Sequence, residues 1–84
     1  MSNDNSMAYT EEESVLQKQI YVEDSILIVN VEYVYEIELS RITDYGQILG
    51  WVNHLCEKTW MNPTLIRRFI SVARKANNLQ LQSL

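Results

Sequence analysis

Apolar and polar residues alternate along residues 27 to 39. The odd positions are all apolar, namely Leu27, Val29, Val31, Tyr33, Tyr35, Ile37 and Leu39. The even positions from Asn30 to Glu38 are mostly polar or charged. Because successive side chains of a strand point to opposite faces, this pattern predicts a half-buried strand. The alternation never changes phase and contains no Gly or Pro, so we expect one long strand.

A shorter segment, residues 16 to 22, predicts a second strand upstream. The three residues between the two segments, Glu23, Asp24 and Ser25, are polar and typical of a tight turn. We therefore expect an antiparallel hairpin in which Val22 lies opposite Ile26.

Apolar residues recur at helical spacing between Asp44 and Cys56 and predict a helix there. Asp44, with Gln47 three residues later, matches the capping-box pattern of a helix start. Gly46 and Gly50, the only glycines of the chain, lie one turn apart in this helix. Each costs about 1 kcal/mol relative to alanine, so we expect the sheet or a second helix to approach their backbone closely.

A second helix is predicted from Asn62 to about Asn77, since asparagine is a favoured N-cap and the following Pro63 suits the first helical position. The fold class is therefore α+β, a two-stranded antiparallel hairpin followed by two antiparallel helices, in the order ββαα. Residues 15–78 form this single domain, between a flexible acidic tail at residues 1–14 and a C-terminal tail at residues 79–84.

The composition is that of one small globular domain: 84 residues, 46% hydrophobic and 21% charged. The longest apolar run is too short to cross a bilayer, so we expect neither a signal peptide nor a membrane helix. A single cysteine is usual in a reducing cytosol, and we expect a cytoplasmic protein. Because so small a core gives marginal stability, we also expect a homodimer, formed through the long strand.

The net charge of -4 is unevenly distributed along the chain. Residues 1–40 hold nine acids against Lys18, whereas residues 41–84 hold six bases against Asp44 and Glu57. In the folded protein the two halves either neutralise each other or present two faces of opposite sign.

No catalytic arrangement is recognisable. His54 and Cys56 are the only residues of their types and are two apart in a predicted helix, so they point in different directions. Glu36 and Glu38 share a strand face about 7 Å apart, a spacing like that of a carboxylate pair, but they lie on a predicted solvent face without a cleft. The sequence contains no Gly-rich phosphate loop and no cluster of metal ligands. We expect a non-enzymatic protein without cofactor or metal.

Nucleic-acid binding is one of two functions that we consider. Two helices joined by a short turn resemble a helix-turn-helix in outline. The second helix carries four bases opposite its apolar side, namely Arg67, Arg68, Arg74 and Lys75. The net negative charge opposes phosphate binding. A nucleic-acid-binding accessory protein or transcription regulator therefore stays the alternative.

Protein binding is the function that we prefer. The acidic strand face formed by Glu32, Glu36 and Glu38 suits a basic, nucleic-acid-binding protein partner. Trp60 lies in the turn between the helices, where it either packs against the turn or serves as an exposed anchor for the partner.

Residues 33 to 73 resemble a pattern that recurs in small uncharacterised bacterial, plasmid and phage proteins. Its motifs are a strand ending in YxIxL (residues 35–39), an LxW helix (residues 49–51) and a KxW turn (residues 58–60). The resemblance implies an accessory protein of a mobile element and carries no assigned activity. By analogy, it implies a phage protein that inhibits a host or defence protein, as an anti-CRISPR does.

Overall fold

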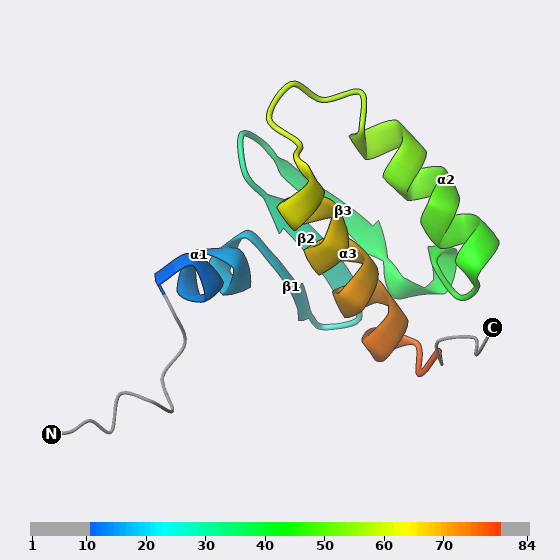
Figure 1. Cartoon of the computed structure of the whole chain (residues 1–84). Coiled ribbons are helices and arrows are strands. Elements are labelled where there is room, and N and C mark those ends of the chain that lie inside the picture. The colour runs from blue at the N-terminus through cyan, green and yellow to red at the C-terminus, as the bar shows by residue number, and fades with distance from the viewer. Residues whose placement is uncertain (1–10, 80–84) are drawn as a thin grey trace, which may run out of the picture.

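The computed structural model describes residues 11–79, in which three strands form one antiparallel sheet in the order β1-β2-β3 (Figure 1). In chain order the elements are α1 (Glu11–Gln19), β1 (Ile20–Glu23), β2 (Ile26–Asn30), β3 (Val34–Glu38), the 3-10 helix η2 (Leu39–Arg41), α2 (Tyr45–Leu55) and α3 (Pro63–Ala76). The predicted α+β class is confirmed. The predicted order ββαα is wrong, because a helix precedes the strands and the sheet has a third strand. Residues 1–10 and 80–84, where most of both predicted tails fall, lie outside the described residues.

The predicted long strand is folded back on itself at residues 31–33, so that it forms both β2 and β3. Leu27 lies opposite Ile37, and Val29 lies opposite Tyr35. Across a loop with an odd number of residues, odd positions pair with odd positions, and the apolar face continues without a change of phase. A two-residue turn would have changed the phase. The unbroken alternation is therefore the same for a straight strand and for this hairpin, which is why the prediction failed.

The β1–β2 hairpin exists, but its predicted register is wrong by one residue. Val22 lies opposite Leu27, where we expected Ile26. The turn consists of two residues only, Asp24 and Ser25, whose φ angles are 53° and 66°. Positive φ at both central residues is the type I′ geometry that matches the twist of a tight hairpin. This register brings Ile20 of β1 opposite Val29, and both side chains are buried.

Residues 11–19 form α1, where we expected the end of a tail and the start of a strand. Leucine, glutamine and lysine, which make up residues 16–19, are good helix formers. Residues 17–19 are all polar and lack the alternation of a strand. Leu16 packs against the core from this helix.

The predicted start of α2 is confirmed. The Asp44 side chain accepts a hydrogen bond from the backbone N–H of Gln47 at 2.8 Å. The Gln47 side-chain oxygen accepts from the backbone N–H of Thr43 at 2.7 Å and from its hydroxyl at 2.9 Å. The return contact of this capping box therefore reaches the residue before the N-cap.

Both predicted ends of α3 are confirmed as well. Asn62 is the N-cap and accepts from the backbone N–H of Leu65 at 2.9 Å, with proline at the first helical position. At the other end Asn78 has a φ of 61°, and the N–H of Leu79 donates to the carbonyl of Arg74 at 2.8 Å. These are the features of a Schellman motif, which ends the helix.

The expected close approach to the glycines of α2 is wrong. Among the described residues, a Cβ added to Gly50 would meet no heavy atom within 4 Å. A Cβ on Gly46 would lie 3.2 Å from the Asp44 carboxylate, which belongs to the cap of the same helix. Neither glycine is required by contact with the sheet or with α3.

One core lies between the sheet and the helices α2 and α3, with α3 crossing the sheet in Figure 1. Its buried members are Ile20, Leu27, Val29 and Ile37 from the strands, Ile42 from the loop after η2, Ile48 and Leu55 from α2, and Leu65, Phe69 and Ala73 from α3. The buried residues of β2 and β3 all have odd numbers, as the alternation predicted. The helices therefore cover only one side of the sheet.

Candidate protein-binding surface

The side of the sheet that faces away from α2 and α3 carries two rows of cross-strand neighbours. The rows are Tyr21–Ile28–Glu36 and Glu23–Ile26–Glu38. We call these six residues the outer face. Its two isoleucines and its tyrosine are half-buried, and its three glutamates are exposed. An apolar centre is therefore bordered by carboxylates along both edges.

The outer face contains three carboxylates and no basic residue. Glu36 and Glu38 are two residues apart on β3, about 7 Å along the strand. Two carboxylates at that distance in water repel each other by about 0.6 kcal/mol, which solvated groups tolerate. Within residues 11–79, Glu23, Glu36 and Glu38 have no ion-pair partner. A lysine or arginine of another protein can therefore approach them without competing with an existing pair.

The β2–β3 loop adds exposed apolar surface at one end of the outer face. Tyr33 is 69% exposed and Val34 is 60% exposed. We expected Tyr33 on the buried face of a strand, but the chain turns at this position and the ring projects into solvent. Glu32 precedes it in the same loop and is exposed. The structure thus places Glu32 at the end of the surface that holds Glu36 and Glu38.

Trp60 lies on the helix side of the sheet, apart from the glutamates. Its ring is half-buried and lies 5.9 Å from the ring of Tyr35, centre to centre, at an interplanar angle of 40°. The Lys58 ammonium lies 5.6 Å from the centre of the same tyrosine ring. Trp60 therefore packs the α2–α3 connection against β3. Of the two roles considered for this residue, this is packing and not that of an exposed anchor.

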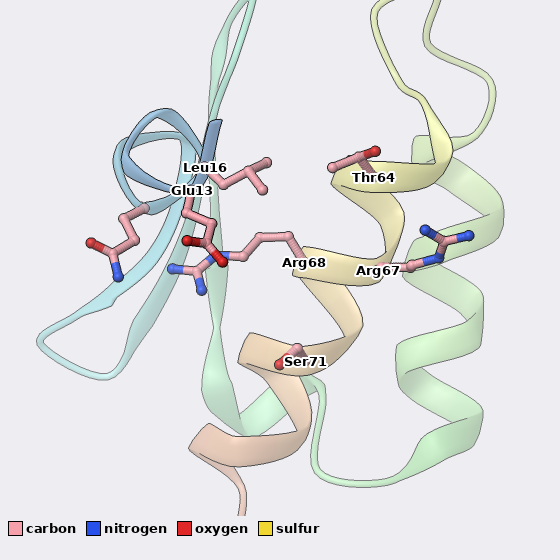
Figure 2. Close-up of a pocket in the computed structure, with 7 residues that line it drawn as sticks. Glu13, Leu16, Thr64, Arg67, Arg68 and Ser71 are labelled. Atoms are coloured by element: carbon pink, nitrogen blue, oxygen red, sulfur yellow. The ribbon is translucent and has the colours of Figure 1, made fainter. Parts of the chain in front are cut away.

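The four bases of α3 do not form one continuous stripe. Arg68 donates from Nε and Nη2 to the backbone carbonyl of Ile20, at 3.1 and 2.8 Å. Arg74 donates to the carbonyl of Leu79 at 3.4 Å. Figure 2 shows Arg67 and Arg68 pointing to opposite sides of the helix. Arg67 and Lys75 are exposed, so two of the four bases bond to backbone and two face solvent.

A groove of about 340 Å³ lies between α1 and α3. Its α3 side is lined by Thr64, Arg67, Arg68 and Ser71. Glu13 lines the α1 side, and its side chain and that of Arg68 point toward one another in Figure 2. A carboxylate beside the arginine opposes the binding of an anion. The groove is therefore a weaker candidate than the outer face.

The residues with possible catalytic chemistry are not brought together. His54 is exposed on α2, with its ring 5.9 Å from that of Trp51. Cys56 is an exposed free thiol at the end of the same helix. Among residues 11–79, no group of three or more His, Cys, Asp or Glu side chains is placed to hold a metal ion.

No protein-family model matches this chain, and no curated protein or solved structure matches it either. In the part of the chain that the structure describes, no helix has the length and apolar character needed to cross a membrane.

The sequence alone did not identify Glu23, Ile26 and Ile28 as neighbours of Glu36 and Glu38. That grouping depends on the three-strand pairing, because each isoleucine lies between a residue of β1 and a residue of β3. The sequence did contain one signal for this grouping. Positions 26 and 28 are even but apolar, and they stand next to apolar odd positions, which indicates that both faces of β2 are partly covered.

Proposed function

We propose that this protein acts by binding a basic protein partner through the outer face of its sheet. The observation that carries the proposal is the cross-strand arrangement of Glu36 and Glu38 beside Ile28 and Ile26. An apolar centre with a charged rim is the usual anatomy of a protein–protein interface. Here the charges of the rim all have the same sign, so the surface selects for a partner of opposite sign.

The apolar and charged parts of the outer face contribute differently. Covering the half-buried isoleucines removes apolar surface from water, which stabilises a complex by about 25 cal/mol per Å². The exposed glutamates contribute to the rate of association and to selectivity more than to affinity, because exposed ion pairs are weak in water. The complex should therefore form more slowly as salt is added, while the apolar contact keeps it bound.

Nucleic-acid-binding proteins present the basic surfaces that such a face fits, since they bind phosphates with lysine and arginine. The resemblance of residues 33–73 to small bacterial, plasmid and phage proteins favours a partner from the host of a mobile element. We therefore propose that the partner is a nucleic-acid-binding host or defence protein, and that occupation of its basic surface inhibits it. Binding of DNA or RNA by α3 has less support, because Arg68 and Arg74 donate to backbone carbonyls.

The test compares Glu36→Lys with Glu57→Lys. Both substitutions change the net charge by the same amount and both positions are exposed, but Glu57 follows α2 and is not part of the outer face. The wild-type protein and each variant are immobilised and exposed to a nuclease-treated extract of the cells in which the protein occurs. We expect one stoichiometric basic protein on the wild type and on Glu57→Lys, and its loss from Glu36→Lys. Far-UV circular dichroism checks that each variant is folded.

Two results would contradict the proposal. If the same protein is retained equally by all three forms, the outer face is not the binding surface. If nothing is retained from the nuclease-treated extract, and nucleic-acid-associated proteins are retained from an untreated one, the basic residues of α3 are the functional ones. Substitution of Arg67 by glutamate would then abolish retention.

A further inference from the structure

The hydrogen bonds of the sheet show which backbone groups of β3 face its free edge. The N–H of Leu39 donates to the carbonyl of Ser25 at 3.0 Å, in the same register as the β2–β3 pairs. Hydrogen-bonded and non-hydrogen-bonded pairs alternate along an antiparallel ladder. The odd residues of β3 therefore bond to β2, and Val34, Glu36 and Glu38 direct their N–H and C=O groups away from it.

The opposite edge of the sheet is already occupied. The carbonyl of Ile20, on β1, accepts two hydrogen bonds from the Arg68 guanidinium. β1 is also only four residues long and follows α1 directly. A short edge strand with a side chain bonded to its outward carbonyl is a poor template for another strand.

The edge of β3 has no such cover. Within residues 11–79, β2 is the only strand that pairs with β3. No hydrogen bond from another described residue reaches the outward backbone groups of Val34 or Glu36. Glu38 is the N-cap of η2, so its carbonyl belongs to the start of that 3-10 helix and only its N–H faces the open edge. The side chains of these three residues are exposed as well. A row of unpaired backbone donors and acceptors is therefore available at one edge of the sheet.

We propose that the partner inserts an extended segment at this edge, as a fourth antiparallel strand with lysine or arginine at alternate positions. The proposal rests on the proposed function and specifies how the basic partner binds. Antiparallel pairing continues the sheet and is slightly more stable per residue than parallel pairing. Addition of a strand to an exposed edge is a common mode of peptide recognition, in which backbone bonds supply affinity and alternate side chains supply specificity.

The charges at the edge select the kind of strand that can add. Residues paired with Glu36 and Glu38 in the new ladder would lie on the outer face beside these carboxylates. Opposite charges in cross-strand pairs stabilise a sheet and like charges destabilise it. A basic strand is therefore favoured, and a neutral apolar strand gains only the backbone bonds.

A second copy of this chain is the occupant that the charges disfavour. The outward residues of β3 are Val34, Glu36 and Glu38, so antiparallel pairing of two β3 strands sets these residues opposite one another. Centring the pair on Glu36, for example, places Glu36 directly opposite its equivalent. The register that pairs Glu36 with Glu38 likewise sets carboxylates of the two copies opposite one another. The homodimer expected through the long strand is therefore opposed both by the absence of that strand and by this repulsion.

The other face of the added strand would lie beside Tyr35 on the helix side of β3. Tyr35 and Trp60 form a half-buried aromatic pair there. Apolar or β-branched residues between the basic positions of the partner would contact this pair. The structure thus favours a segment in which basic and apolar residues alternate.

The test uses a fluorescein-labelled nine-residue peptide, Lys-Thr-Lys-Val-Lys-Val-Lys-Thr-Lys, and fluorescence anisotropy at low salt. We expect the wild-type protein to bind it and Glu36→Lys to bind about tenfold more weakly, as expected when an attractive cross-strand pair becomes repulsive. Glu57→Lys is the matched control and should bind within about twofold of the wild type. A loss of affinity that is equal in both variants would overturn the proposal.

Two N-methylated versions of the peptide test the backbone pairing itself. In the proposed antiparallel strand, residues whose side chains lie beside Glu36 and Glu38 also direct their N–H groups at β3. Methylation of the nitrogens of the three central lysines should abolish binding, whereas methylation of the valine and threonine nitrogens should leave it within about threefold. Both peptides keep the same charges and the same side chains.

The results separate this inference from the proposed function. If both methylated peptides bind alike, or only methylation at valine and threonine abolishes binding, antiparallel addition at the edge is overturned. Should Glu36→Lys still weaken binding in that case, the acidic face binds basic segments without adding a strand, and the proposed function stands. If the unmethylated peptide does not bind the wild type at all, strand addition is overturned, and capture from the extract decides the proposed function.

Discussion

Replacement of Gly50 by alanine is expected to stabilise the protein, although the sequence favours the opposite result. Gly50 is the sixth of the eleven residues of α2, so the full difference in helix propensity between glycine and alanine applies there. A Cβ at this position meets no heavy atom of the described residues within 4 Å. The substitution therefore adds no clash and removes the entropic cost of glycine, about 1 kcal/mol in a helix interior.

The size of this effect is measurable. For a domain of 60–100 residues, 1 kcal/mol corresponds to a change of about 4–8 °C in Tm. We expect a rise of that order for Gly50→Ala in thermal unfolding followed by circular dichroism. Urea unfolding should show a higher midpoint with an unchanged m-value, since the exposed surface is the same.

Gly46→Ala is the matched comparison within the same helix. Its Cβ would lie 3.2 Å from the Asp44 carboxylate, and that carboxylate caps α2 through the N–H of Gln47. We expect a smaller gain than at Gly50, because the cap must shift by a few tenths of an ångström. A fall in Tm for Gly50→Ala would refute the reasoning, because it would mean that another segment approaches this position as closely as the sequence suggested.

Two further substitutions test the fold. Ser25→Gly should stabilise the protein by about 0.5–1 kcal/mol, because Ser25 has a φ of 66° and the left-handed region is costly for residues with a Cβ; a lower midpoint in urea unfolding would contradict the type I′ turn. Arg68→Met keeps the aliphatic stem but removes both hydrogen bonds to the carbonyl of Ile20, and should cost about 1–2 kcal/mol in the same assay. Arg67→Met, at an exposed position, should change the stability by less than about 0.5 kcal/mol, and equal costs at the two arginines would contradict the structural role of Arg68.

The division of residues 27–39 into two strands was not predictable from their alternation, yet strand length offered a signal. A straight strand of this length would extend about 43 Å at 3.3 Å per residue. Strands of globular proteins are usually 3–10 residues long. Residues 31–33 lack Gly, Pro, Asn and Asp, so the turn itself had no local signature.

The candidate site was predictable in part, for a related reason. Glu36 and Glu38 follow from the alternation, and the structure leaves them exposed on one face. The separation of Trp60 from them does not follow, because it depends on which side of the sheet the α2–α3 connection crosses. The four bases lie on α3, as predicted. They are not all free to bind a partner, because Arg68 donates to a backbone carbonyl 48 residues away in the chain.

By itself, the sequence determined the features that depend on neighbours within about one helical turn. Asp44 and Asn62 accept from N–H groups three residues later, and the left-handed Asn78 ends α3. The alternation likewise determined which side chains of β2 and β3 are buried. Only the tertiary structure decided where the alternating segment folds back and which edge of the sheet stays open. Both depend on contacts between residues far apart in the chain, whose free energies no local pattern records.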